Sequence, residues 1–485
     1  TSISGIVQSL FSANIGAVDY IIAFTTAGAG IGINASTGAQ TTFAPAGTFT
    51  NPDMTVFASG RLLIQDPTAG YSTWDGTLFV TGGGVSPKII VTNGGSLYAV
   101  APTVAISGGS GSGATATAVM AGQSVVGVKL TAAGSGYKAG DTLTVAFTPV
   151  SGGSGAAATA VIWPIQFGTT IAVFAGRVWW GNGRVLQFTG TAGYDDTDPG
   201  NAAGAITITD ADLSHSITAV RTLNNYLYIF GDSSVRQIGS ISVSSNITLF
   251  TPLILASDIG TPFPKTILSY NRLVLFANKI GVYAIFGASV EKISDDLDGI
   301  FGGLNSTGSS IDFSLTPSAA LNDIRNIHCY LLLVRYIDPL MGLRSIILAF
   351  QEKVWFVISQ GNGLTAITSA ELNSTKTVET FGSSGNDVTQ LLEDPTVSVS
   401  ITLQTSLTPH GNPLQAKQPL RAGIGLNIQG VSNSLVLSID TENGSLSYNF
   451  SNVALVKWVN NLGQEIIWLN NSGQVVSWAG SGYRF

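Results

Sequence analysis

The sequence predicts an all-β protein: a β-propeller core with an inserted Gly/Ser-rich β-domain and a C-terminal antiparallel β platform. Two observations lead to this prediction. Short apolar runs, each followed by a turn of small polar residues and a second apolar run, recur at intervals of about 40–50 residues, the spacing of propeller blades. The first third of the chain interrupts this pattern with a duplicated segment rich in Gly, Ser, Thr and Ala. The alternative, a β-sandwich, has hairpins at shorter spacing.

The duplicated segment occupies residues 91–119 and recurs, slightly lengthened, at residues 130–161. Tyr98 of the first copy corresponds to Tyr137, 39 positions further on. Alternating Val, Thr and Ala suit narrow β-strands, and the Gly-Gly-Ser-Gly strings suit tight turns. We therefore expect residues 85–163 to form a β-domain of their own, inserted into the propeller.

The propeller hairpins are clearest in the middle of the chain. Arg177, Asn225 and Arg272 each stand before a strong apolar run, at spacings of 48 and 47 residues. This interval is that of successive blades, each a small antiparallel sheet. Less regular strand pairs are expected over Arg61–Thr81, from Tyr330, from Lys353 and from Glu465 to the end.

Changes in pattern give the expected domain boundaries. The stretch from Thr396 to Asn449 alternates apolar and polar residues strictly, as half-buried strands of an antiparallel platform do. Helical periodicity is confined to Ser4–Val18 and, more weakly, to residues 369–382, where β-branched residues disfavour a helix. The expected division is an N-terminal segment with the first propeller strands (1–84), the insertion (85–163), the blades (164–395), the platform (396–452) and a closing blade (453–485).

Composition argues against a protein that grips nucleic acid. Charged residues make up only 10% of the chain, against about 25% in an ordinary globular protein. Lys and Arg total 21 and do not cluster, and the net charge is −7. Because affinity for nucleic acid comes largely from neutralised phosphates, tight binding is not expected. A surface along which DNA slides without sticking fits the same composition.

Neither a membrane span nor a signal peptide is expected. The mean hydropathy is high, at +0.34, but a span needs about 18 uninterrupted apolar residues. The best candidate, Ile327–Phe350, is interrupted by charges and a proline. The apolar N-terminal stretch has no basic region before it, which disfavours a signal peptide. The interrupting residues are Arg335, Asp338, Pro339 and Arg344.

Catalytic chemistry is not expected, and no catalytic, cofactor-binding or metal-binding residue is assigned. The single cysteine, Cys329, excludes an internal disulfide and lies in an apolar run, as a small buried side chain would. His215, His328 and His410 have no second ligand at metal spacing. We expect His328 in the core and His410 in a loop. No G-x-S-x-G nucleophile motif occurs.

Two acidic clusters leave calcium binding open. They offer hard oxygen ligands, as calcium prefers, but they lack the spacing of an EF-hand. Aspartates also cap turns, which is the interpretation we favour here. The clusters are Asp195, Asp196 and Asp198, and Asp295, Asp296 and Asp298.

Four tryptophans raise the question of sugar binding. Aromatic rings stack on sugars when several are exposed together, but in strands they more often pack in a core or a subunit contact. We expect packing for Trp179, Trp180, Trp458 and Trp478.

The stretch RVWWGNGRVLQFTGTAGYDDTDPGNAAGAITITDADLSHSITAVRTLNNYLYIFGDSSVRQIG, residues 177–239, resembles the nozzle proteins of short-tailed bacteriophages, the tail tubular protein B family. LIQDPTAGYSTWDG, with Trp74, is similar to an early portion of that family, and the resemblance extends over residues 55–300. The duplicated segment resembles the Gly-rich repeats of phage tail and fibre proteins. Within 177–239 the family pattern falls on Tyr194–Asp196, Ala205–Ile208, Ile217–Leu223, Leu227–Phe230 and Ser233–Gly239.

The resemblance implies a structural virion protein of the phage tail without enzymatic activity or cofactors. It would be a subunit of a homohexameric nozzle ring that retains DNA and conducts it during ejection. Its expected partners are other copies of the chain, a tail adaptor and tail fibres, with DNA passing through the lumen without specific binding. The negative balance agrees, because like charge keeps DNA from adhering. The insertion would contact fibres, an adaptor or the host cell surface.

Two other classes remain open. A receptor-binding protein or tailspike contacting host surface glycans would need a groove with paired carboxylates and aromatic side chains, if it also cleaved them. A secreted propeller lectin is the third possibility, and no signal peptide supports it.

Overall fold

The computed structural model describes residues 1–392 apart from 59, 192, 210–212, 214, 299, 302–309, 325–326, 339–341, 359–362 and 373–376. Beyond them it describes only β37 (Ser434–Thr441), β38 (Gly444–Ser451), β39 (Trp458–Val459) and β40 (Glu465–Ile466). The chain divides into two compact units, Thr1–Val397 and Ser398–Phe485.

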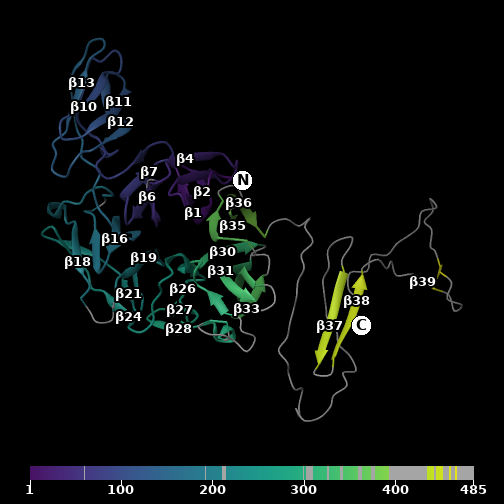
Figure 1. Ribbon diagram of the computed structural model, residues 1–485. Helices are drawn as coiled ribbons and strands as arrows, with labels where there is room; N and C mark the ends of the chain where they lie inside the picture. The colour runs from purple at the N-terminus through teal and green to yellow at the C-terminus, as the bar shows by residue number, and fades with distance from the viewer. Residues whose placement is uncertain are drawn as a thin grey trace. The chain divides into compact units, whose positions relative to one another are not determined.

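In the described part of the first unit, seven antiparallel sheets follow one another along the chain, and each is one blade (Figure 1). The first four blades are β1–β4 (Val7–Ile15, Val18–Thr25, Gly30–Asn34, Gln40–Ala44), β5–β8 (Asp53–Phe57, Arg61–Asp66, Gly70–Trp74, Phe79–Val80), β15–β18 (Thr170–Phe174, Arg177–Asn182, Val185–Phe188, Gly204–Thr207) and β19, β20, β21 and β24 (Ile217–Leu223, Tyr226–Gly231, Val235–Ile238, Leu253–Ala256). The remaining three are β25–β28 (Leu268–Tyr270, Leu273–Ala277, Val282–Phe286, Ser289–Lys292), β29–β33 (Ser310–Asp312, Ser318–Ile324, Ile327–Asp338, Gly342–Gln351, Val354–Ile358) and β34–β36 (Ala366–Glu371, Val378–Ser384, Asp387–Leu391).

Seven apolar clusters join consecutive blades, among the described residues, and the last cluster joins the seventh blade to the first. Strand β20 shows how this works. Leu227 and Ile229 pack toward the blade before it, and Tyr228 and Phe230 toward the blade after it. Because successive side chains of a strand point to opposite faces, a strand between two neighbours is apolar throughout. The first unit is therefore a β-propeller, as the sequence predicts.

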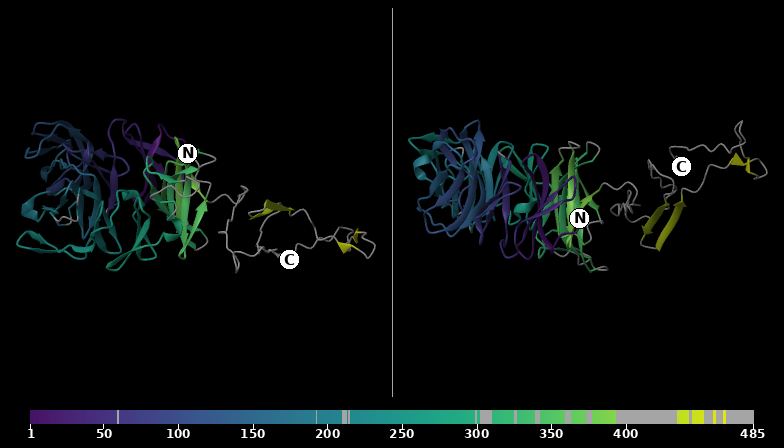
Figure 2. Two further views of the ribbon diagram at one scale, coloured as in Figure 1. Left: turned by 60° about the horizontal axis from the view of Figure 1, so that its bottom comes forward. Right: turned by 90° about the horizontal axis from the view of Figure 1, so that it is seen from above.

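The N-terminal residues close the ring. The amino group of Thr1 donates to Val388 O at 2.7 Å, and Ile3 N donates to Asn386 O at 2.8 Å, so the chain start lies along β36. Figure 2 shows the N-terminus beside the green strands of this blade. Residues 453–485, which the sequence predicts to form a closing blade, lie outside the described residues apart from β39 and β40. Within that range the described strands β39 and β40 pair with each other.

The two expected helices are strands. Ser4–Val18 contains β1, in which Leu10 faces the seventh blade and Ile15 the second blade. Burial on both faces produced an apolar pattern resembling a helical stripe. Of residues 369–382, 369–371 belong to β34 and 378–382 to β35. The helices among the described residues are three short 3₁₀ turns, and none is long and apolar enough to cross a membrane.

The recurring polar positions mark the turn between the first and second strands of a blade. Asn224 and Asn225 have φ angles of 51° and 65°, and Asn271 and Arg272 have φ angles of 47° and 68°. Two consecutive residues in the left-handed region form a type I′ turn, whose twist matches that of a hairpin. Arg177 directly follows the equivalent turn. The regular spacing therefore reports one turn repeated from blade to blade.

The insertion is a six-stranded sheet in the order β12-β11-β10-β13-β14-β9. The two copies of the repeat exchange strands, because β9 of the first copy pairs with β14 of the second. Tyr98 and Tyr137 also pack across copies: a Cβ on Gly153 would lie 2.4 Å from Tyr98, and one on Gly111 2.5 Å from Tyr137. Neither copy is thus a separate unit. The strands are Ile90–Ser96, Thr103–Ser107, Ser112–Ala121, Ser124–Ser135, Thr144–Thr148 and Ser154–Thr159.

The second unit contains an antiparallel hairpin of β37 and β38, inside the range predicted as a platform. The other strands expected between Thr396 and Asn449 lie outside the described residues.

Candidate functional site

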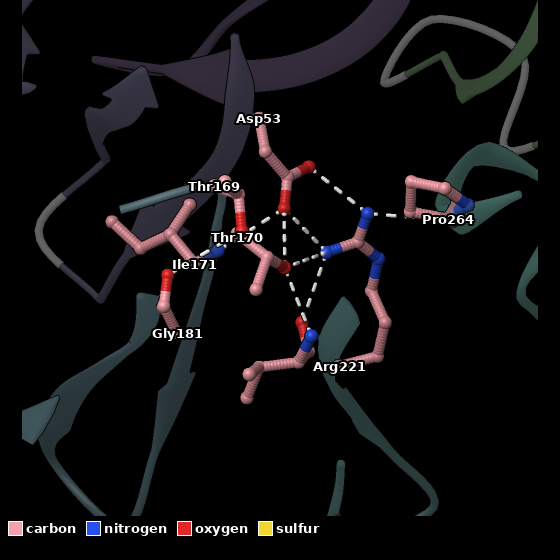
Figure 3. Close-up of polar contacts among 8 residues, drawn as sticks. Asp53, Thr169, Thr170, Ile171, Gly181, Arg221 and Pro264 are labelled. Carbon is pink, nitrogen blue, oxygen red and sulfur yellow. Dashed lines mark hydrogen bonds and ion pairs between the residues drawn. The ribbon is translucent and has the colours of Figure 1, made fainter. Parts of the chain in front are cut away.

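A buried charge network lies among the first strands of three consecutive blades (Figure 3). Asp53 of β5 accepts hydrogen bonds from both terminal nitrogens of Arg221 of β19, at 2.6 and 2.9 Å. Between them lies β15, whose Thr170 hydroxyl and Ile171 N–H also donate to Asp53, at 2.8 and 3.0 Å. One carboxylate therefore connects the second, third and fourth blades.

Arg221 extends the network to the fifth blade. Its guanidinium donates to Val220 O at 2.9 Å and to Pro264 O at 3.3 Å, where the chain enters that blade. Thr170 Oγ1 accepts from Val220 N at 2.9 Å. Both charged side chains are mostly buried, with 17% of Arg221 and 8% of Asp53 exposed. Removing one partner of a buried ion pair typically costs about 3–5 kcal/mol, because the other charge then stays buried without compensation.

Lys265 is a second cation close to Asp53 and Arg221. It lies in the short 3₁₀ turn Pro264–Thr266, and its Nζ is 5.7 Å from the centre of the Phe11 ring of β1. The pKa of Lys265 is lowered to about 8, mainly by burial; the negative charge of Asp53 opposes this shift, and the positive charge of Arg221 adds to it. Asp53 is already engaged by four donors, so it is poorly placed to act as a general base.

This network was not predictable from the sequence pattern. The available signal was an isolated charge within an apolar strand, ITAVRTL for Arg221, in a chain with few charges. Nothing in the sequence links it to Asp53, which is 168 positions away. Only the circular order of the blades brings the two together.

In the first acidic cluster, Asp195 contacts Ser86 and Lys88 at the start of the insertion. Asp195 Oδ2 accepts from the Ser86 hydroxyl at 2.5 Å, and Lys88 Nζ lies 3.9 Å from Oδ1. Burial raises the pKa of Asp195, and the hydrogen bond from Ser86 counteracts this shift. Asp196 accepts from Asn201 Nδ2, and Asp198 caps the turn at Gly200 N. Asp195 thus binds the start of the insertion, whereas Asp196 and Asp198 stabilise their own loop.

The second acidic cluster pairs with a lysine. Lys292 Nζ lies 3.7 Å from Asp295 and is also bonded to Asp298. In the part of the chain that the structure describes, no group of three or more His, Cys, Asp or Glu side chains is placed to hold a metal ion. The aspartates of the second cluster thus take part in a surface ion pair.

The tryptophan pair is buried rather than exposed to sugars. Trp179 packs with the fourth blade and Trp180 with the second blade and the insertion, because neighbours in a strand face opposite ways. Trp163 is also fully buried and donates to Tyr71 O at 2.8 Å. The prediction of core packing is confirmed for Trp179 and Trp180. The side chains of Trp458 and Trp478 lie outside the description.

The remaining candidates are scattered. Cys329 is half-buried, and burial raises the pKa of its thiol, which disfavours the thiolate. His328 is exposed, so its prediction as a core residue is wrong: it lies near the end of the β30–β31 hairpin, beyond the packed part. His215 pairs with Asp232 at 3.2 Å in an exposed position. His410 lies outside the described residues.

No protein-family model and no curated protein matches the chain. Among solved structures, it is similar to BamB from Moraxella catarrhalis, with 13% identity and a TM-score of 0.38 over 80% of this chain and 96% of that chain. It is also similar to the β-propeller domain of Cps50 (Swd1) from Myceliophteria thermophila, with 11% identity and a TM-score of 0.30 over 78% and 97% of the two chains. These likenesses concern the fold alone. The assignment as a β-propeller rests on the blades and the clusters that join them.

Proposed function

We propose that this protein is a structural virion protein, a subunit of the distal nozzle ring of a short phage tail that retains DNA and then conducts it during ejection. In this role its partners are other copies of the chain, a tail adaptor and tail fibres. DNA passes without specific binding, consistent with a net charge of −7 and few basic residues.

The single observation that carries the proposal is the structural use of the segment that resembles nozzle proteins. Residues 177–239 form the outer strands of the third blade and most of the fourth. In the acidic loop of this segment, Asp195 also accepts a hydrogen bond from Ser86 at the start of the insertion. The segment that resembles the nozzle family thus helps to hold the β-domain that is inserted between β8 and β15. A rigidly anchored appendage suits a protein that docks fibres or receptor-binding parts.

One observation favours the second candidate, a receptor-binding protein or tailspike that contacts host glycans. Thr117, Thr103 and Thr148 lie side by side on adjacent strands of the insertion and are all exposed. Such a row of hydroxyl groups offers regularly spaced hydrogen-bonding positions to a polar polymer. The row lies entirely on the insertion.

Native mass spectrometry and electron microscopy of the purified chain test the nozzle proposal. We expect a closed ring, most simply of six subunits, with an open lumen. A chain that stays monomeric while binding or cleaving host capsular polysaccharide would support the second candidate instead. Cleavage of any such polysaccharide would contradict a purely structural role.

A further inference from the structure

Lys265 lies where blades from opposite sides of the ring meet. Its Nζ is 5.7 Å from the centre of the Phe11 ring, so the entry to the fifth blade contacts the first blade. These two blades are not neighbours, since the first packs on the second and seventh, and the fifth on the fourth and sixth. Blades that are not neighbours meet across the axis around which a propeller is built. The contact therefore places Lys265 at the inner ends of the blades.

The charges at this place do not balance. Arg221 and Lys265 are both cations, and the carboxylate that acts on the pKa of Lys265 is that of Asp53. Asp53 forms its ion pair with Arg221 and accepts two further hydrogen bonds, from Thr170 and Ile171. One positive charge is thus left over at the axis, in a chain whose net charge is −7.

The Lys265 ammonium has no acceptor of its own. Among the described residues it makes no hydrogen bond and no ion pair, and its contact is with the face of the Phe11 ring. The side chain is half-buried, and its Nζ is not sealed from solvent. An ammonium carries three N–H donors, and lysines surrounded by protein are as a rule paired. Lys265 therefore offers a charged group with three donors to an acceptor from solution.

We propose that Lys265 binds a small oxyanion, a phosphate or a carboxylate group, at the axis of the propeller. The charge left over beside Asp53 and Arg221 is positive, so an anion neutralises it. An oxyanion supplies several acceptor oxygens, and hydrogen bonds between an ammonium and a charged oxygen are among the strong ones. The lowered pKa of Lys265 agrees with a partly buried ammonium that lacks a partner.

This site goes beyond the proposed function, because it concerns the stability of the ring of blades within one chain. Lys265 and Phe11 come together only when the first and fifth blades are in place. An anion that binds there binds the folded protein and not the unfolded chain. It therefore stabilises the propeller in proportion to its occupancy.

Chemical labelling of the wild-type chain tests the site. Reductive methylation with formaldehyde and cyanoborohydride at pH 8 is followed at each lysine by mass spectrometry of peptides. The reaction is run in sodium chloride, sodium phosphate and sodium acetate of equal ionic strength. A bound anion covers Nζ and stabilises the ammonium, which leaves less free amine to react. At about ten times the Kd of the anion we expect labelling of Lys265 to fall about tenfold. The exposed Lys279 is the internal control and should not change.

Thermal unfolding of Lys265→Met gives a second measurement. Phosphate stabilises proteins without binding to a site, so the comparison is with the control Lys279→Met. We expect phosphate to raise the Tm of the wild type and of the control by more than it raises the Tm of Lys265→Met. In chloride, Lys265→Met should be at least as stable as the wild type, because it removes a charge without a partner.

The two measurements also define what would overturn the site. Equal labelling of Lys265 in all three salts would do so, as would equal effects of phosphate on the Tm of all three proteins. A Lys265 that is not labelled even in chloride would contradict an accessible Nζ, and with it the site. If Lys265→Met does not fold, labelling of the wild-type chain decides. The salt that protects at the lower concentration identifies the group as phosphate or carboxylate. The nozzle proposal is tested separately by the oligomeric state.

Discussion

Arg221 reaches across the first strand of the third blade to hold Asp53 of the second blade through both carboxylate oxygens. The two residues are 168 positions apart. Their bond is therefore formed only when three blades stand in order.

Removing one partner of this pair should destabilise the ring strongly. We expect Arg221→Met to lower the free energy of unfolding by about 3–5 kcal/mol, because the Asp53 carboxylate then stays buried without its cation. Lys292→Met, which breaks an exposed pair with Asp298, should cost at most about 1 kcal/mol. Urea titrations of both variants give the comparison. Equal losses of unfolding free energy in the two variants would show that breaking the Asp53–Arg221 pair costs no more than breaking the Lys292–Asp298 pair.

The double variant Asp53→Asn/Arg221→Met completes the test of this pair. Because no unpaired charge remains, it should be less destabilised than the sum of the two single variants. Additive effects would contradict direct coupling.

At the contact between Ser86 and Asp195, the free energy of unfolding should depend more on the Ser86 hydroxyl than on the charge of Asp195. Ser86→Ala leaves a buried carboxylate without its hydroxyl donor and should cost about 1–3 kcal/mol. Asp195→Asn keeps an acceptor oxygen and removes the charge, so it should be neutral or stabilising at pH 7. Chemical denaturation of both variants checks the order, and a more damaging Asp195→Asn would refute it.

The pH dependence of this difference follows from the raised pKa of Asp195. When the pKa of a carboxyl is higher in the folded protein than in the unfolded chain, the folded protein loses stability as the pH rises from the unfolded pKa through the folded one. The advantage of Asp195→Asn over the wild type should therefore be present at neutral pH and vanish below the unfolded pKa. Unfolding curves of both proteins between acidic and neutral pH measure this difference in the free energy of unfolding. A difference that grows on acidification would contradict a raised pKa of Asp195.

Closure of the ring should be sensitive to Ile3. This side chain is 5% exposed and packs in the cluster that joins the first and seventh blades. Ile3→Asp should lower the free energy of unfolding by about 3 kcal/mol or more, since it buries a charge beside the closing strand. The control, Ile6→Asp, changes a residue that is 56% exposed and should have little effect. Hydrogen exchange should also accelerate in β36 for the first variant alone.

The insertion should be removable only if Trp163 is retained. Deleting residues 87–160 with a short glycine link should leave the propeller folded, whereas deleting Val85–Trp163 also removes a ring packed on Tyr71. Replacing the fully buried Trp163 by alanine should cost about 3–5 kcal/mol by itself. Circular dichroism and thermal unfolding distinguish the deletions. Equal behaviour would place Trp163 in the insertion rather than in the propeller.

Several features were predictable from local patterns. The apolar runs and their turns predict the blades, because a strand that is packed on both faces is apolar throughout, as β20 is. The repeated turn at Asn224–Asn225 and Asn271–Arg272 needs two left-handed residues, which limits its sequence. The same double burial misled the prediction for Ser4–Val18, since a strand with two apolar faces lacks a clear alternation.

The sequence by itself therefore determined the strands, their turns and the presence of a duplicated insertion, because each depends on residues close together in the chain. The tertiary structure decided what depends on distant residues. It placed Thr1 and Ile3 beside β36, exchanged strands between the repeats and joined Asp53 to Arg221. These pairings have no local signature, since a hydrogen bond or ion pair depends on position in space and not on separation along the chain.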